Sequence, residues 1–336
     1  MTESGWAGWT AVVAGGVLQG GFMLPMKWTK RWAWENTWLV FACTAYLLCP
    51  WLLILTTTPQ AFDVYRMSGA GPILLVLLFG LGWGLGALTF GLGVDLLGLA
   101  LGFAIILGIA ACAGALVPLW VSSSPISSTK LLMTIVALLL MLGGVAFCSL
   151  AGRWKEKQSA VQRRSYGKGV LLCAVSGLLS ACGNLGFAFG QPIVDRAQAA
   201  GVAPDLASNV VWALLTVALF LCNAGYAIRL LFRNRTGAKF GQPGTRSYFI
   251  LGILMGVMWM GGFVFYGAGA RRLGRLGPSL GWAILMSAMV LTANVLGVIT
   301  GEWKGAPPTA TRTLCLGLAL LLFAITLLAY ANNLTG

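Results

Sequence analysis

The sequence contains no histidine and only eight acidic residues among 336, and charged residues of all kinds make up 9% of the chain. Soluble domains carry roughly a quarter of their residues as charged side chains, so a soluble protein is excluded. The absence of histidine removes the commonest metal ligand and general base. With no metal-ligand cluster and no activated nucleophile visible, we expect neither an enzyme nor a bound metal.

Several other signatures are missing as well. The eight cysteines lie inside apolar runs without a CxxC pair, so we interpret them as small packing residues. There is no GxxxxGK[ST] loop to couple the chain to nucleotide hydrolysis, and no cofactor is expected. A channel or a sensor would show a symmetric polar ring or a soluble domain, and the sequence has neither. The N-terminus lacks a basic region and a cleavage site, so we expect the first apolar run to be retained.

Long apolar runs dominate the chain, and 58% of its residues are hydrophobic. Runs of about 20 apolar residues recur, each long enough to cross a hydrocarbon core of about 30 Å. We therefore expect an all-α integral membrane protein with ten transmembrane helices. The predicted spans are Trp6–Leu24, Thr37–Thr56, Gly71–Val94, Leu96–Val121, Leu131–Gly152, Gly169–Gln191, Leu206–Ile228, Tyr248–Ala270, Pro278–Thr300 and Thr313–Asn332.

An internal repeat organises these spans. The glycine-rich segment that begins at Gly80 returns about 176 residues later at Gly256, and both copies read as two apolar helices joined by a short turn. The polar connection Arg153–Lys168 divides the chain into two five-span halves, residues 1–160 and 161–336. Because five is odd, the second half enters the membrane from the opposite side. We expect an inverted repeat of two bundles around a shared pathway, within a single membrane domain.

The basic residues predict the orientation. Sixteen of the 22 Lys and Arg residues lie in the loops after the odd-numbered spans, and six lie on the other side. Cytoplasmic loops carry such an excess, so we expect both termini to lie outside. The net charge of +14 thus reflects membrane anchoring rather than nucleic-acid binding. The expected partners are the lipid bilayer and a small molecule, with the chain a monomer or weak homodimer.

Glycine accounts for 46 residues, near twice the average share of about 7%. Small residues four apart allow membrane helices to approach closely. Static packing is one interpretation of these glycines, and helices that slide or bend during a transport cycle are the other. The candidates for packing or gating, concentrated in the two repeated hairpins, are Gly80, Gly84, Gly98, Gly256, Gly262 and Gly274.

Several segments resemble a known family. LQGGFMLPMKWTKRWAWENTW (18–38), CPW (49–51), LFGLGWGLGALTFGLGVDLLGLALGFAIILGI (78–109), MWMGGFVFY (258–266) and GEWKGAP (301–307) are similar to the L-rhamnose–proton symporter family of the drug/metabolite transporter superfamily. The resemblance covers nearly the whole chain and is strongest in the first 120 residues. It implies ten helices in an inverted five-plus-five repeat, a bacterial inner-membrane location, and sugar uptake coupled to protons.

A sugar site needs amides for the hydroxyls and aromatic faces for the CH surface. Further aromatics within the spans include Phe187 and Trp212. Gln19 and Asn184 have an alternative role as hydrogen-bonding links between helices, and the tryptophans one as membrane-interface anchors. We expect the repeat mates Trp83 and Trp259, and likewise Phe90 and Tyr266, on opposite walls of one cavity. The predicted substrate-binding residues are Gln19, Trp83, Phe90, Asn184, Gln191, Trp259, Tyr266, Trp282 and Asn294.

No Asp, Glu or His lies in the interior of a predicted span. The candidates for proton coupling are therefore Glu35, in the family-like WAWEN segment, and Asp95, in the expected turn between spans three and four. Each has an alternative reading as a helix-end charge. The sequence predicts a secondary transporter that takes up L-rhamnose or a related deoxy-sugar by proton-coupled alternating access. The alternative is a uniporter, exchanger or exporter of another small metabolite.

Overall fold

The computed structural model describes residues 3–97, 99–121, 127–155 and 166–333. Within these ranges, ten helical stretches are long and apolar enough to cross a membrane, which confirms the predicted all-helical membrane fold. The long helices are α1 (Glu3–Gly21), α2 (Trp34–Ala42) continuing into α3 (Cys49–Thr57), α5 (Ala70–Leu97), α6 (Leu99–Val121), α7 (Ser128–Lys155), α8 (Tyr166–Phe189), α10 (Asn209–Asn234), α11 (Arg246–Arg272), α12 (Gly277–Ile299) and α13 (Pro308–Asn333).

Two short helices and several irregular turns complete the described chain. α4 (Ala61–Ser68) follows α3, and α9 (Gln191–Ala199) follows α8. The 3-10 turns are Leu24–Trp28, Gly237–Gly241 and Gly274–Leu276. Between α2 and α3 the helix widens into a π-helical segment, Cys43–Leu48, directly before Pro50. Because proline has no backbone N–H to donate, the hydrogen-bond ladder is already interrupted at this point.

The expected turn at Asp95 is wrong. Asp95 belongs to the last turns of α5, which continues to Leu97, and α6 begins at Leu99. Leu96 and Leu97 pack against Gly169 of α8, so a further helical turn buries apolar surface that a loop would leave exposed. Gly98, predicted to pack or to move in this hairpin, lies outside the described residues.

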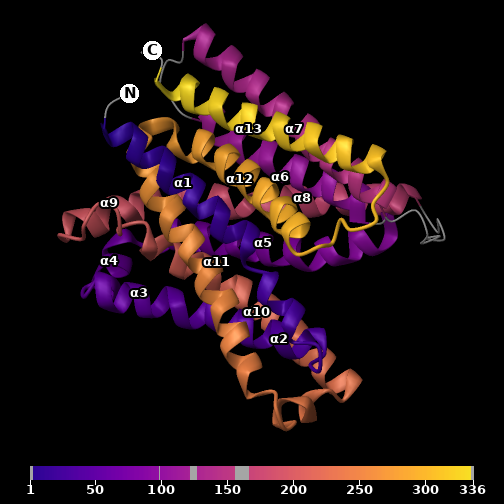
Figure 1. The fold of residues 1–336 in the computed structure, drawn as a ribbon. Coiled ribbons are helices and arrows are strands. Elements are labelled where there is room, and N and C mark those ends of the chain that lie inside the picture. Colours follow the sequence, from indigo (N-terminus) through magenta and orange to yellow (C-terminus); the bar gives the residue numbers. More distant parts are fainter. Residues whose placement is uncertain (1–2, 98, 122–126, 156–165, 334–336) are drawn as a thin grey trace.

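Figure 1 shows how the helices are arranged in space. α7 and α13 lie side by side at one edge, α1 runs between α11 and α12, and α5 packs on α8. The described ends of the chain, Glu3 and Asn333, lie on the same side of the bundle, which we call the terminal face. The opposite side carries the basic loops after α1, α10 and α12, and we call it the basic face.

Glycines at corresponding positions of the two halves make corresponding contacts. Gly80 of α5, the third span, lies against the backbone of Leu215 in α10, the seventh span. Its repeat mate Gly256 of α11, the eighth span, lies against Thr44 in the second span, where a Cβ would be 2.6 Å from the threonine Cβ. The third span thus packs on the seventh as the eighth packs on the second. This is the pattern that an inverted repeat produces.

A second pair of glycines follows the same rule. At Gly86 of α5, a Cβ would lie 2.7 Å from the backbone N of Ser180 in α8. At its mate Gly262 of α11, a Cβ would lie 2.8 Å from Gln19 Cγ in α1. α1 and α8 are the first helices of the first and second halves, so the third helix of each half packs on the first helix of the other half.

The remaining predicted glycines divide into two kinds. At Gly84 in α5, a Cβ would lie 2.8 Å from Cys222 Sγ in α10, which indicates close packing. At Gly274 a Cβ would have no neighbour within 4 Å, but the backbone φ is +79°. That left-handed conformation favours glycine, so Gly274 serves the turn from α11 to α12 rather than a helix contact.

Candidate functional site

A cavity of about 870 Å³ lies at the terminal face, where α6, α8 and α11 end and α10 and α12 begin. Ligand pockets commonly span roughly 300–1,000 Å³, so its size suits a small molecule. The described lining includes Phe187, Gln191, Ser208 and Gly267, with Arg271 at the exposed rim. None of the described lining residues carries a carboxylate.

The inner end of the cavity is aromatic. Phe187 lines it and stacks on the fully buried Trp212, with ring centroids 4.9 Å apart and planes 9° apart. Phe263 and Tyr266 hold the other sides of the Trp212 ring, at centroid distances of 4.8 and 6.0 Å. The indole is thus fixed by packing on several sides. Of these four rings only Phe187 lines the cavity, and a flat, rigid ring suits the CH face of a sugar.

Behind this aromatic group lies a buried polar cluster around Asn184 of α8. The Asn184 amide nitrogen donates hydrogen bonds to the carbonyl oxygens of Gly114 in α6 (2.7 Å) and Pro278 in α12 (2.8 Å). The hydroxyl of Tyr266 in α11 donates to Asn184 Oδ1 at 2.5 Å. Trp282 Nε1 donates to the carbonyl of Ala110 at 3.2 Å. Asn184 therefore connects four helices at the base of the cavity.

Gln19, the predicted amide on the first helix of the first half, is buried at 5% exposure in α1. Its amide nitrogen donates to the carbonyl oxygen of Trp259 in α11 at 2.7 Å. The repeat mates Trp83 and Trp259 stack on each other, with centroids 5.6 Å apart and planes 29° apart. They meet directly at the centre of the bundle rather than across the described cavity, and their contact with substrate stays a prediction.

The other predicted substrate residues are dispersed. Gln191 lies on the cavity wall and donates to Asp195 Oδ1 at 2.8 Å. Phe90 contacts Phe103 edge-to-face at 4.9 Å, away from Tyr266. Asn294 donates to the carbonyl of Val290 in its own helix at 2.8 Å. Among the described positions, the structure thus brings Asn184, Tyr266 and Trp282 together below the cavity.

Sequence reasoning missed most of the cavity lining, including Ser208 and Gly267. Ser208 precedes Trp212 by four residues, so both side chains project from the same side of α10. Gly267 is the repeat mate of Gly91, and among the many glycines of the repeat nothing in the sequence marks it as a residue of the cavity wall. A serine four residues before a tryptophan, at the start of a predicted helix, was the sequence signal that could have identified Ser208.

The carboxylates lie towards the two faces of the bundle. Glu35 at the start of α2 is 4% exposed and accepts hydrogen bonds from Asn234 Nδ2 (3.0 Å) and Thr236 Oγ1 (2.7 Å) on the basic face. On the terminal face, Arg272 hydrogen-bonds Asp205, with Nε 3.1 Å from Oδ1, and holds the pKa of that carboxyl below its usual value. The backbone of Asp95 lies within α5, and its side chain falls outside the described residues.

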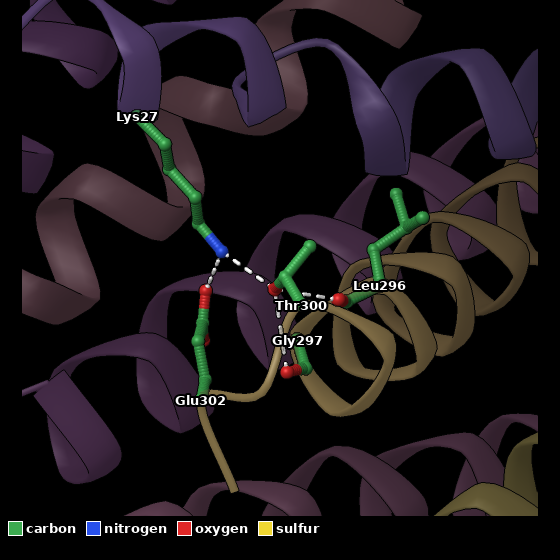
Figure 2. Close-up of polar contacts among 5 residues, drawn as sticks. All are labelled: Lys27, Leu296, Gly297, Thr300 and Glu302. Carbon is green, nitrogen blue, oxygen red and sulfur yellow. Dashed lines mark hydrogen bonds and ion pairs between the residues drawn. The ribbon is translucent and has the colours of Figure 1, made fainter.

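Polar contacts connect the two halves of the chain on the basic face. Figure 2 shows Lys27, just after α1, reaching Glu302 as an ion pair and donating to Thr300 Oγ1 at 2.7 Å. Arg31 donates to the carbonyl of Pro243 at 2.8 Å. The first half therefore holds the second half on this face, whereas the described cavity lies at the terminal face.

Comparisons with known proteins agree with this architecture. The L-rhamnose-proton symporter of Klebsiella pneumoniae subsp. pneumoniae is 29% identical over 319 residues, covering 90% of this chain and 91% of the relative. The protein of the same name from Mannheimia succiniciproducens is 28% identical over 313 residues, with the same coverage. A solved crystal structure with 14% sequence identity matches 97% of this chain and 96% of its own at a TM-score of 0.61, which supports the fold.

One family model matches nearly the whole chain. The model described as L-rhamnose-proton symport protein (RhaT) matches residues 7–332, which includes both five-span halves. The matched range includes the repeated hairpins, the described lining of the cavity and the residues that make the contacts on the basic face. The chain therefore belongs to the L-rhamnose-proton symport protein (RhaT) family.

Proposed function

We propose that this protein takes up L-rhamnose, or a closely related deoxy-sugar, together with protons across the bacterial inner membrane. The family and the names of the relatives support the substrate and the coupling ion. The observation that carries the proposal is the asymmetry between a cavity at the terminal face and inter-half contacts on the basic face. Alternating access requires a transporter to be open on one side at a time.

The basic loops indicate that the basic face is cytoplasmic, because cytoplasmic loops carry the excess of Lys and Arg. On this proposal the cavity opens outward and both termini lie outside. Residues 1–160 and 161–336 form the two repeats that move against each other. Opening the cytoplasmic side would separate Lys27 from Glu302 while the cavity at the terminal face closes.

Uptake of labelled L-rhamnose tests this function. Cells that lack their own rhamnose transporter are expected to accumulate the sugar when they express this protein, and a protonophore is expected to abolish accumulation. A rate no higher than that of empty cells would contradict the substrate. Equilibration that the protonophore does not affect would contradict proton coupling and favour a uniporter.

We assign proton coupling to Glu35 and Asp95. Glu35 supports the assignment because Asn234 and Thr236 of the other half hold its carboxylate, so protonation would weaken an inter-half contact. Replacing Glu35 with Gln is expected to abolish accumulation against a gradient while rhamnose exchange across the membrane continues. The measurement is accumulation compared with counterflow in vesicles. Accumulation at the unaltered level in Glu35→Gln would refute the role of this residue.

Trp83→Ala is expected to reduce uptake at least tenfold, because the ring fills the contact between α5 and α11 at the centre of the bundle. Trp83 stacks on Trp259 and meets Phe263 edge-to-face at 5.3 Å. The measurement is initial uptake per amount of protein in the membrane. Trp120→Ala is the matched control, since Trp120 is 89% exposed and is expected to leave uptake unchanged. Equal rates for the two variants would show that the central tryptophan is dispensable.

A further inference from the structure

Two buried polar atoms beside the cavity have no hydrogen-bond partner. Ser208 is 5% exposed and Trp212 is fully buried, and both Ser208 Oγ and Trp212 Nε1 are unpaired. Buried polar groups in folded proteins are nearly always paired, and an unpaired one beside a cavity can take its partner from a bound ligand. A hydroxyl group on a bound ligand is such a partner.

The absence of a side chain at Gly267 lets both atoms lie close to α11. A Cβ at Gly267 would lie 3.1 Å from Trp212 Nε1 and would clash with Ser208 Oγ. Gly267 and Ser208 both line the cavity. Glycine therefore lets the serine hydroxyl and the indole N–H lie close to the backbone of α11 at the cavity wall, where any larger residue would displace the serine hydroxyl.

The donor at this position is fixed before a ligand arrives. Trp212 is held by Phe187, Phe263 and Tyr266, so its N–H cannot turn away to another partner. Ser208 Oγ can both donate and accept, whereas the indole N–H can only donate. A ligand hydroxyl can accept from Trp212 and donate to Ser208 at the same time. The ring of the ligand would then lie in the cavity that Phe187 also lines.

We infer that Ser208, Trp212 and Gly267 form a subsite that recognises one hydroxyl group of a neutral sugar ring. The inference rests on the proposed function and adds the residues that select among sugars. A site built to hydrogen-bond a hydroxyl discriminates strongly against an analogue that lacks it, because its polar atoms are left unpaired. The subsite therefore determines which hydroxyl pattern the cavity accepts.

The test is a binding titration of the purified protein with L-rhamnose and its monodeoxy analogues. Trp212→Phe keeps a stacked ring and removes the N–H, and Ser208→Ala removes the hydroxyl. Each is expected to raise the Kd for L-rhamnose about tenfold, the factor that corresponds to the loss of one hydrogen bond. Both variants are also expected to lose the discrimination against the same monodeoxy analogue.

Matched controls come from unpaired atoms elsewhere in the described chain. Ser287 Oγ and Trp51 Nε1 are likewise buried without partners, and neither residue lines the cavity. Ser287→Ala and Trp51→Phe are expected to bind every sugar as the unaltered protein does. Such controls separate a ligand contact from a general effect of removing a buried polar atom.

The outcomes distinguish this inference from the proposed function. If the unaltered protein binds L-rhamnose and both cavity variants keep its affinity and selectivity, the subsite is refuted and the function stands. If the cavity variants and the controls weaken binding equally, the effect is structural and the subsite is refuted. If the unaltered protein binds no sugar of the series, the proposed substrate fails and the subsite fails with it.

Discussion

Gly80→Ala is expected to destabilise the folded protein by about 1–3 kcal/mol, the usual cost of overpacking a close contact. A Cβ at Gly80 would clash with the carbonyl oxygen of Leu215 and lie 3.1 Å from its carbonyl carbon and Cα. These are backbone atoms of α10, so no side-chain rotation relieves the contact, and the two helices must move apart. The measurement is the melting temperature of the detergent-purified protein, together with rhamnose uptake.

The control for this prediction lies in the same helix. Gly91 of α5 has no atom within 4 Å of the position that a Cβ would take. Gly91→Ala is expected to keep or slightly raise the melting temperature, because alanine is favoured over glycine within helices by up to about 1 kcal/mol. If the two alanine variants melted at the same temperature, the close contact at Gly80 would be irrelevant to stability.

Asn184→Ala is expected to destabilise the protein by roughly 2–4 kcal/mol. It removes three hydrogen bonds that join α8 to α6, α11 and α12 and takes away the side-chain donor to the Gly114 carbonyl, whereas the Tyr266 hydroxyl keeps the Pro278 carbonyl as an acceptor at 3.2 Å. Each orphaned group costs about 1–3 kcal/mol in soluble proteins, and membrane interiors average nearer 0.6 kcal/mol per interhelical bond. The measurements are the melting temperature and the initial rate of rhamnose uptake, made on the same preparation.

A double-mutant cycle with Tyr266→Phe identifies the source of the loss. The Tyr266 hydroxyl donates to Asn184 Oδ1, so the two substitutions are expected to cost less together than the sum of their separate effects. Additive effects would contradict a shared hydrogen bond. An unchanged melting temperature in Asn184→Ala with complete loss of uptake would favour direct sugar binding over the linking of helices.

The spans could be predicted because they depend on patterns within the sequence, and the structure is consistent with the repeat expected from the same patterns. Apolar length determines which segments cross a membrane, and Gly80 and Gly256 mark equivalent places in two copies of one plan. The structure adds that these glycines face equivalent partners, Leu215 and Thr44. The sequence alone could not identify those partners, because they lie on helices whose packing is not encoded locally.

The site was harder to predict, for the same reason. Sequence reasoning selected Asn184 as a polar residue in an apolar helix and left its role open between substrate and helix contacts. The hydrogen-bond partners that bear on this choice, Gly114 and Pro278, are 70 and 94 residues away in the chain. The cavity depends on the ends of five helices meeting at one face, and Ser208 and Gly267 acquire significance only there.

Because the described chain has ten candidate membrane spans, an even number, its two ends lie on the same side of the membrane, and this can be used to determine which side the cavity faces. The cavity lies at the face where the described chain starts at Glu3 and ends at Asn333. A reporter enzyme fused beyond either end would therefore share a compartment with the cavity. A phosphatase that folds only in the periplasm would be active at both fusions if the cavity faces outward, and inactive at both if it faces the cytoplasm.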